Sequence, residues 1–178
     1  MEFNFKDILT TSMVLFAVID IIGNIPIIID LRKKAGHIQS EKASLIAGFI
    51  LIIFLFLGEQ LLSIIGLDVH SFAIAGSLII FFIALEMILG IKIYKEEKNP
   101  LNATVFPLAF PLIAGPGSLT TLLSLKAAFS NANIIAAIII NMFFIYIVLK
   151  ASTKIEKIIG ENGIGIIRKV FGVILLAI

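Results

Sequence analysis

Six long apolar runs dominate this sequence, and two of them are interrupted by short segments rich in glycine, proline and polar residues. The first interruption covers residues 20–26 (Asp-Ile-Ile-Gly-Asn-Ile-Pro), and the second covers residues 111–118 (Pro-Leu-Ile-Ala-Gly-Pro-Gly-Ser). A helix in hydrocarbon must satisfy its own backbone groups, so such breaks are tolerated only where protein or water takes over. Two breaks at corresponding places in two halves are typical of a binding site inside a membrane.

The composition indicates an integral membrane protein. Of the 178 residues, 60% are hydrophobic and 15% are charged, with a mean hydropathy of +1.13. A soluble domain is closer to one-half apolar and one-quarter charged. The net charge of +2 is too small to indicate nucleic-acid binding, and the absence of cysteine excludes disulfides and thiolate chemistry. His37 and His70 lie near predicted loops, which excludes a two-histidine metal site on one helix, and we expect no cofactor.

The apolar runs predict six membrane-spanning helices, because a span needs about 20 mainly apolar residues. The N-terminus lacks the basic region and the cleavage site of a signal peptide, so the first run is interpreted as a span. The sixth run is short. The predicted spans cover residues 8–29, 43–65, 71–91, 103–125, 134–149 and 164–178.

The positions of the positive charges predict the orientation. The loops between spans 1 and 2, 3 and 4, and 5 and 6, together with the start of the sixth span, contain 12 of the 14 lysines and arginines, and only Lys6 and Lys126 lie on the other side. The positive-inside rule places the 12-charge side in the cytoplasm. We therefore expect a multi-pass protein of the cell membrane, with both termini outside.

Three spans lie on each side of a charged linker, and this arrangement predicts the fold class. Residues 1–91 form the first three-helix repeat, residues 92–102 a cytoplasmic linker, and residues 103–178 the second repeat. An odd number of spans gives the halves opposite orientations. We therefore predict an all-α membrane protein built from two inverted repeats, whose broken helices 1 and 4 face each other at the midplane. Superposing Gly23 on Gly115 gives weak support for the repeat.

The sequence resembles the MarC family of multi-pass membrane proteins over nearly its whole length. Residues 20–26 are similar to the Asp-Pro-x-Gly-Asn-x-Pro signature of that family, with Ile21 in place of the usual proline. Residues 107–118 resemble its second signature, and residues 79–90 and 167–176 are also similar to it. The resemblance implies a transporter of small neutral amino acids such as glycine and alanine, related to LysE-type exporters. Export is therefore the expected direction, with uptake as the open alternative.

The two breaks supply the predicted substrate site. Each helix that restarts after a break points unpaired amides and a positive dipole end into the protein. We expect the carboxylate of a zwitterionic amino acid to bind these amides, and its ammonium group to bind free carbonyls around residues 19–22 and 113–114, or Asp20. Asn24 and Ser118 are predicted to cap the restarting helices, with residues 115–117 as a non-helical link. The predicted substrate-binding residues are Asp20, Gly23, Asn24, Ile25, Ala114, Gly115, Gly117 and Ser118.

Two carboxylates are candidates for coupling transport to protons. Asp20 lies near the predicted midplane, where burial raises a carboxylate pKa. Alternatively, Asp20 caps backbone amides and does not touch substrate. Glu86 is the second candidate, although it lies near the cytoplasmic interface, where pairing with Lys92 is the alternative. Asn141, deep in the fifth run, is expected to tie two helices together.

The residue inventory excludes the main enzymatic alternatives. An intramembrane aspartyl protease needs two aspartates in the membrane, and only Asp20 lies there. A serine–histidine protease needs a histidine at depth, and neither histidine is predicted there. The sequence also lacks the Walker loop that binds ATP. Besides a transporter, a passive channel or facilitator for a small solute and a non-transporting structural membrane protein remain as alternatives. The sequence leaves open whether the chain forms a homo-oligomer.

Overall fold

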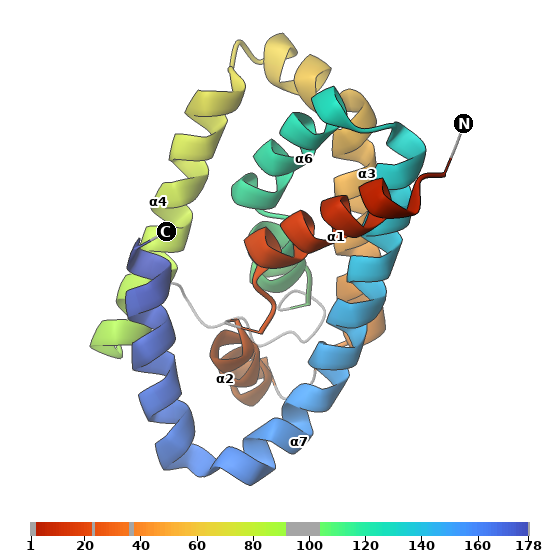
Figure 1. Cartoon of the computed structure of the whole chain (residues 1–178). Helices are drawn as coiled ribbons and strands as arrows, with labels where there is room; N and C mark the ends of the chain where they lie inside the picture. Colours follow the sequence, from red (N-terminus) through yellow and green to blue (C-terminus); the bar gives the residue numbers. More distant parts are fainter. Residues whose placement is uncertain (1–2, 23, 36–37, 92–103, 178) are drawn as a thin grey trace.

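The computed structural model describes residues 3–22, 24–35, 38–91 and 104–177 (Figure 1). Within these ranges the chain is helical, with short connections and no strand. The helices, in chain order, are α1 (Phe5–Ile19), α2 (Ile25–Ala35), α3 (Ser40–Ile64), α4 (Val69–Leu89), the π-helix η1 (Thr104–Ile113), α6 (Pro116–Ala128) and α7 (Asn131–Ala177).

Both predicted breaks are present. The first apolar run divides into α1 and α2, which are separated by residues 20–24. The fourth run divides into η1 and α6, and these two helices are bent by 47° at a break of two residues, Ala114 and Gly115. Pro107 and Pro111 lie inside η1. A proline removes a backbone donor and clashes with the preceding turn, which accounts for the irregular winding there.

Glycines with positive φ mark the two other interruptions. Gly66 has a φ of 71° and lies between α3 and α4. Gly160 has a φ of 70° and a ψ of 171° and is the non-helical residue inside α7. Residues other than glycine rarely adopt these angles. The polar segment 150–163, which the sequence predicts to connect the fifth and sixth runs as a short amphipathic helix, is helical up to Gly160, where a kink separates two helices.

Among the described residues, two helices, Ser40–Ile64 and Asn131–Ser152, are long and apolar enough to cross a membrane, and the bent pair of η1 and α6 makes a third candidate. The helices α1 and α2 contain 15 and 11 residues. Each alone is shorter than the roughly 20 residues that a span needs. The six-span inverted arrangement and the boundaries of its halves stay predictions, and the linker at 92–102 lies outside the described residues.

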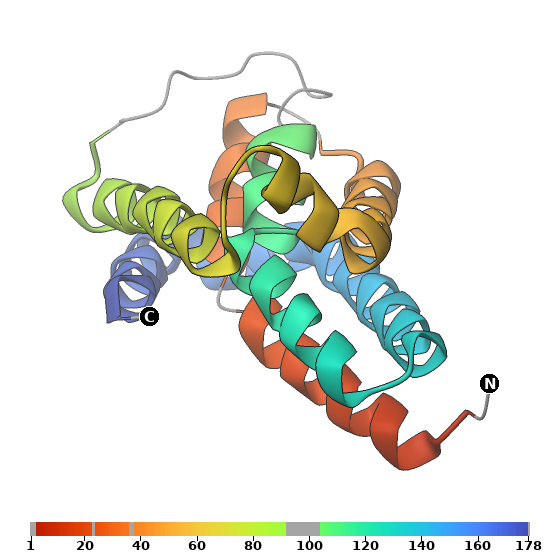
Figure 2. The same ribbon diagram turned by 90° about the horizontal axis from the view of Figure 1, so that it is seen from above.

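Each of the two long helices, α3 and α7, packs against the broken helix of the other half of the chain. Helix α3 packs against η1 and α6, whereas α7 packs against α1 and α2. Gly48 of α3 lies so close to α7 that a Cβ atom there would be 2.9 Å from Cγ of Met142. Helix α4 and the C-terminal part of α7 lie side by side at one edge, as Figures 1 and 2 show.

The distribution of polar side chains fits a protein surrounded by lipid. Large apolar side chains such as Phe49 (65% exposed) and Phe143 (66%) cover the outside. Thr11, Asn24 and Asn141 are instead buried inside. Soluble monomers rarely expose apolar patches of this extent, because water penalises them.

Candidate functional site

The first break begins with an unusual backbone conformation at Asp20. Helix α1 ends at Ile19, and Asp20 follows in the left-handed region with φ 45° and ψ 48°. Its N–H donates to the carbonyl of Phe16 at 3.1 Å, and its own carbonyl accepts from the N–H of Asn24 at 3.0 Å. Aspartate and asparagine adopt this conformation more readily than most residues. The side chain is partly buried, and Asp20 is the only ionisable residue in the two break segments.

Asn24 ties the two sides of the first break together. Its side-chain Nδ2 donates to the carbonyl of Ile19, the last residue of α1, at 3.1 Å. Its backbone carbonyl accepts from the N–H of Ile28 in α2 at 3.0 Å. The Oδ1 atom is buried and has no hydrogen-bond partner in the part of the chain that the structure describes. The predicted side-chain cap of α2 is therefore not made, because the amide is turned toward the end of α1.

The second break is shorter and fully packed. Ala114 and Gly115 are buried, and α6 begins at Pro116. The hydroxyl group of Ser118 donates to the carbonyl of Ile113 at 2.9 Å and to that of Gly115 at 3.0 Å. Residues 116 and 117 thus belong to the helix rather than to the predicted link. Ser118 does not accept from the helix amides, because its hydroxyl faces the carbonyls behind it.

The two breaks use the same hydrogen-bonding device. In each, a polar side chain in the restarting segment donates to the last carbonyl of the preceding helix, five residues earlier. The donors are Asn24 and Ser118, and the acceptors are Ile19 and Ile113. Equivalent positions are 94 residues apart in both cases. Gly66 and Gly160, two of the glycines with positive φ, are also 94 residues apart.

The end of α1 and the start of α6 lie against each other. A Cβ atom added at Gly117 would be 3.6 Å from Cγ1 of Val18, two residues before Asp20. Pro116 has no N–H, and the amides of Gly117 and Ser118 have no hydrogen-bond partner among the described residues. The start of α6 therefore offers two donors and a positive helix end next to the first break.

The carbonyl groups differ from the prediction. Those of Ile19 and Ile113 were expected to be free for a ligand, but each accepts a side-chain hydrogen bond. The chain provides its own donors there, so each carbonyl has at most one lone pair left for a ligand. Asn24 Oδ1 is the additional acceptor that sequence reasoning missed, because its availability depends on which way the amide group turns.

The other predicted site residues differ in burial, and some lie outside the described residues. Ile25 begins α2 and is partly buried, while Ala114 and Gly115 are buried beside Pro111. Gly23 and the side chain of Glu86 lie outside what the structure describes. The ligand-binding and proton-coupling roles stay predictions. Among the described residues, no group of three or more metal-binding side chains occurs.

Side-chain hydrogen bonds join the first broken helix to α7. Asn133 accepts from the N–H of Asn4 at 3.2 Å, and Asn141 Nδ2 donates to both the carbonyl and the hydroxyl of Ser12 at 3.1 Å. The prediction that Asn141 ties two helices together is confirmed. Further along, Arg32 of α2 donates to the carbonyl of Leu149 at 3.0 Å. These ties hold both sides of the first break against one long helix.

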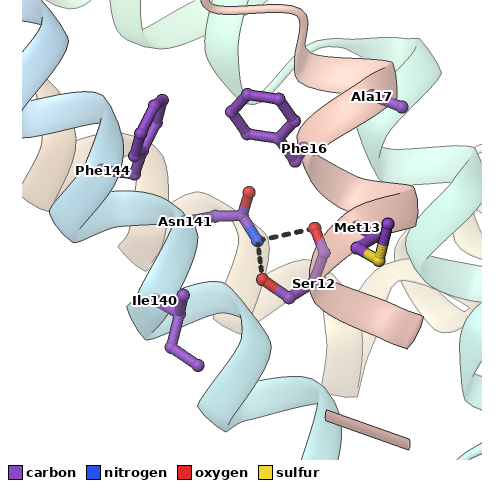
Figure 3. Close-up of a pocket in the computed structure, with 7 residues that line it drawn as sticks. All are labelled: Ser12, Met13, Phe16, Ala17, Ile140, Asn141 and Phe144. Carbon is purple, nitrogen blue, oxygen red and sulfur yellow. Dashed lines mark hydrogen bonds between the residues drawn. The ribbon is translucent and has the colours of Figure 1, made fainter. Parts of the chain in front are cut away.

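An apolar groove lies beside these ties, between α1 and α7 (Figure 3). It has a volume of about 420 Å³, and Phe16 and Phe144 meet edge to face along it with ring centres 5.1 Å apart. Asn141 already donates its amide hydrogens within the protein. The seven lining residues belong to neither break: Ser12, Met13, Phe16, Ala17, Ile140, Asn141 and Phe144. The groove is suited to apolar groups rather than to a charged ligand.

Comparison with known proteins gives a consistent result. A family model described as MarC family integral membrane protein matches residues 5–178. A UPF0056 membrane protein of Buchnera aphidicola subsp. Schizaphis graminum (strain Sg) is 33% identical over 189 residues, which cover 99% of this chain and 89% of the relative. One from Aquifex aeolicus (strain VF5) is 32% identical, over 92% of this chain and 84% of the relative. The UPF0056 inner membrane protein YhgN of Escherichia coli (strain K12) is 29% identical, over 96% and 91%. No solved structure matches the chain.

Proposed function

Because this chain belongs to the MarC family of integral membrane proteins, we propose that it is a secondary transporter of small neutral amino acids, such as glycine and alanine, working by alternating access. The observation that carries the proposal is the pair of breaks. In each break a side chain donates a hydrogen bond to the last carbonyl of the preceding helix. The start of α6 also lies against the end of α1. Broken helices that meet in this way are how many transporters build a site for a charged substrate in the membrane.

The offset of 94 residues supports an inverted repeat. It superposes Gly23 and Asn24 on Gly117 and Ser118, in place of the expected superposition of Gly23 on Gly115. It also relates Gly48 to Met142, the two residues that meet between α3 and α7. A contact between a residue and its own equivalent must lie on the twofold axis. The contacts of α3 with η1 and α6 correspond to those of α7 with α1 and α2, which supports the same symmetry.

The positions of Gly66 and Gly160 suggest which parts move. Each glycine follows a long core helix and precedes a helix at the edge, namely α4 or the end of α7. These two edge helices pack against each other. We propose that they swing as one unit on the two glycines and expose the break region to one side at a time.

A zwitterionic amino acid fits the chemistry of the break region. Its carboxylate would accept from the amides of Gly117 and Ser118, which lack partners within the described structure. Asp20 lies in the adjoining break and is the proposed proton carrier. Export across the cell membrane, with both termini outside, belongs to the same proposal, and the Escherichia coli relative is described as an inner membrane protein.

Uptake into proteoliposomes tests the proposal. We expect labelled glycine and alanine to enter in preference to leucine, and a pH gradient to drive accumulation. Preloading with unlabelled glycine should accelerate the uptake of labelled glycine, because a carrier returns faster when loaded. A lack of acceleration with intact uptake would indicate a channel. The absence of any amino-acid transport by folded protein would contradict the proposal and favour a structural role.

A further inference from the structure

We propose that Oδ1 of Asn24 accepts a hydrogen bond from the ammonium group of the transported amino acid. This inference rests on the proposed function and assigns a role within the same site. The geometry of the first break fixes the orientation of the amide. Nδ2 donates to the carbonyl of Ile19 at 3.1 Å. The reverse orientation would place two oxygen atoms in contact, so Oδ1 must face away from Ile19.

The Oδ1 atom lacks a donor although it is enclosed by protein. Asn24 is only 3% exposed, and Oδ1 has no hydrogen-bond partner among the described residues. A buried acceptor without a donor is costly, and such groups in native proteins are normally satisfied by protein, water or a ligand. An acceptor held in this state beside a break in a membrane helix therefore points to a donor that arrives from outside the chain.

The equivalent residue in the second break shows what a purely structural tie requires. Ser118 closes η1 by donating to Ile113, as Asn24 closes α1 by donating to Ile19. The serine does this without an amide oxygen. The tie therefore does not explain why the first break carries an asparagine, and the extra acceptor is the part of Asn24 that the tie leaves unused.

The surroundings favour a ligand that carries both a donor and an anion. The amides of Gly117 and Ser118 need an acceptor, and they lie at the start of α6, which contacts Val18 near the end of α1. Asn24 is bound to Ile19, the next residue along α1. An α-amino acid brings both groups on neighbouring atoms: an ammonium donor for Oδ1 of Asn24 and a carboxylate for the amides at the start of α6.

The test compares two ligands and two variants of the purified, full-length protein. Asn24→Ser keeps a donor for the carbonyl of Ile19, as in the second break, but removes the amide oxygen. Glycine and N,N,N-trimethylglycine serve as probes, because the second keeps both charges but has no N–H donor. The matched control is Thr11→Val, which removes another buried oxygen without a partner, in the middle of α1.

We expect the wild type to bind glycine at least tenfold more tightly than trimethylglycine in equilibrium binding. Asn24→Ser should lose about tenfold in glycine affinity, a typical loss for a hydrogen bond to a charged donor. Its affinity for trimethylglycine should not change, so its preference for glycine disappears. Thr11→Val should bind both ligands as the wild type does.

The outcomes separate this inference from the function on which it rests. A wild type that binds neither glycine nor alanine overturns the proposed function. Glycine binding that is unchanged in Asn24→Ser, or equally weakened in Thr11→Val, overturns only the role of Asn24. If Asn24→Ser does not fold, Asn24→Thr replaces it, because threonine also keeps a hydroxyl donor for the carbonyl of Ile19 and lacks the amide oxygen. A preference for glycine that persists in folded Asn24→Thr also overturns the inference.

Discussion

The two breaks use the same type of hydrogen bond but differ in length and in packing. Both close the end of a helix with a side chain five residues further along the sequence. The first takes five residues to do so, including Asp20 in a left-handed conformation and a buried asparagine oxygen without a donor. The second takes two buried residues and begins its helix at once with Pro116. The first break leaves one buried amide oxygen without a donor among the described residues, whereas the second is tightly packed around Gly115.

Gly115→Ala should have the largest effect on stability, because Gly115 lies inside the tightly packed second break. A Cβ atom there would overlap the carbonyl oxygen of Pro111. Prolines on both sides limit how far the backbone can move to relieve the overlap. We expect Gly115→Ala to destabilise the protein by about 4 kcal/mol or more, measured as melting in detergent. Gly117→Ala is the control, since its Cβ would make an ordinary contact with Val18. Equal melting of both variants would show that the second break is not rigid.

Substitutions at Gly66 and Gly160, which both have positive φ, should have the next largest effect. Nothing lies within 4 Å of a Cβ atom at Gly66 or Gly160, so alanine there tests backbone conformation without a clash. We expect each substitution to cost about 1–3 kcal/mol and to slow transport more than it weakens binding. Gly165→Ala is the matched control, because that glycine is also uncrowded but has no positive φ. If Gly160→Ala behaved like the control, the proposed hinge would be wrong.

Removing the tie at Asn141 should have a moderate effect on the first broken helix. Asn141→Leu deletes donors to Ser12 and Ala137. We expect a loss of about 1–2 kcal/mol, because single hydrogen bonds between membrane helices contribute modestly. Hydrogen exchange should rise in α1 more than in η1, which packs against α3 instead. A uniform rise in both would indicate that the two broken helices are not held independently.

Asp20→Asn should leave stability nearly unchanged while altering coupling. Asparagine adopts the left-handed conformation as readily as aspartate does, so the backbone of the first break should persist. We expect the variant to exchange glycine but to lose accumulation driven by a pH gradient, both measured in proteoliposomes. Asp20→Ala should show the same loss of coupling plus a lower melting temperature. Full accumulation by Asp20→Asn would remove Asp20 as the proton carrier.

The smallest effect concerns the turn before α4. Ser71 donates from its N–H and its hydroxyl group to the carboxylate of Asp68, both at 2.8 Å, and these bonds lower the pKa of Asp68 below 3.8. A lowered pKa in the folded state stabilises the protein above the ordinary pKa and is lost as the pH falls through the lowered value. Asp68→Ala should therefore melt slightly earlier than the wild type at pH 7 and equally at pH 2. A difference that persists at pH 2 would show that the carboxylate charge is not responsible.

Sequence patterns predicted much of the fold. Apolar run length located the helices, and glycine with proline located both breaks, because these residues disrupt a helix wherever they occur. The orientation of polar side chains at the breaks was not predictable in the same way. Asn24 could equally have capped α2, and Ser118 could have capped α6. Only the fold shows that each turns back to the preceding carbonyl, because that choice depends on how the two helix ends approach each other.

The position of the kink in α7 could not be predicted, for a different reason. The charged segment after Lys150 is helical up to Gly160, as charged residues are good helix formers. The single glycine that interrupts this helix could not be distinguished from its neighbours Gly163 and Gly165 by residue type alone. The shared offset of Gly66 and Gly160 became visible only once their backbone angles were known.

The meeting of Gly48 with Met142 carries a consequence for how such a chain could have arisen. Two copies of the first half would pair glycine with glycine and leave a hole at the centre, and two copies of the second would force two methionines into one place. Under the proposed symmetry, each half has become dependent on the other. A gene encoding either half alone should no longer yield a working homodimer.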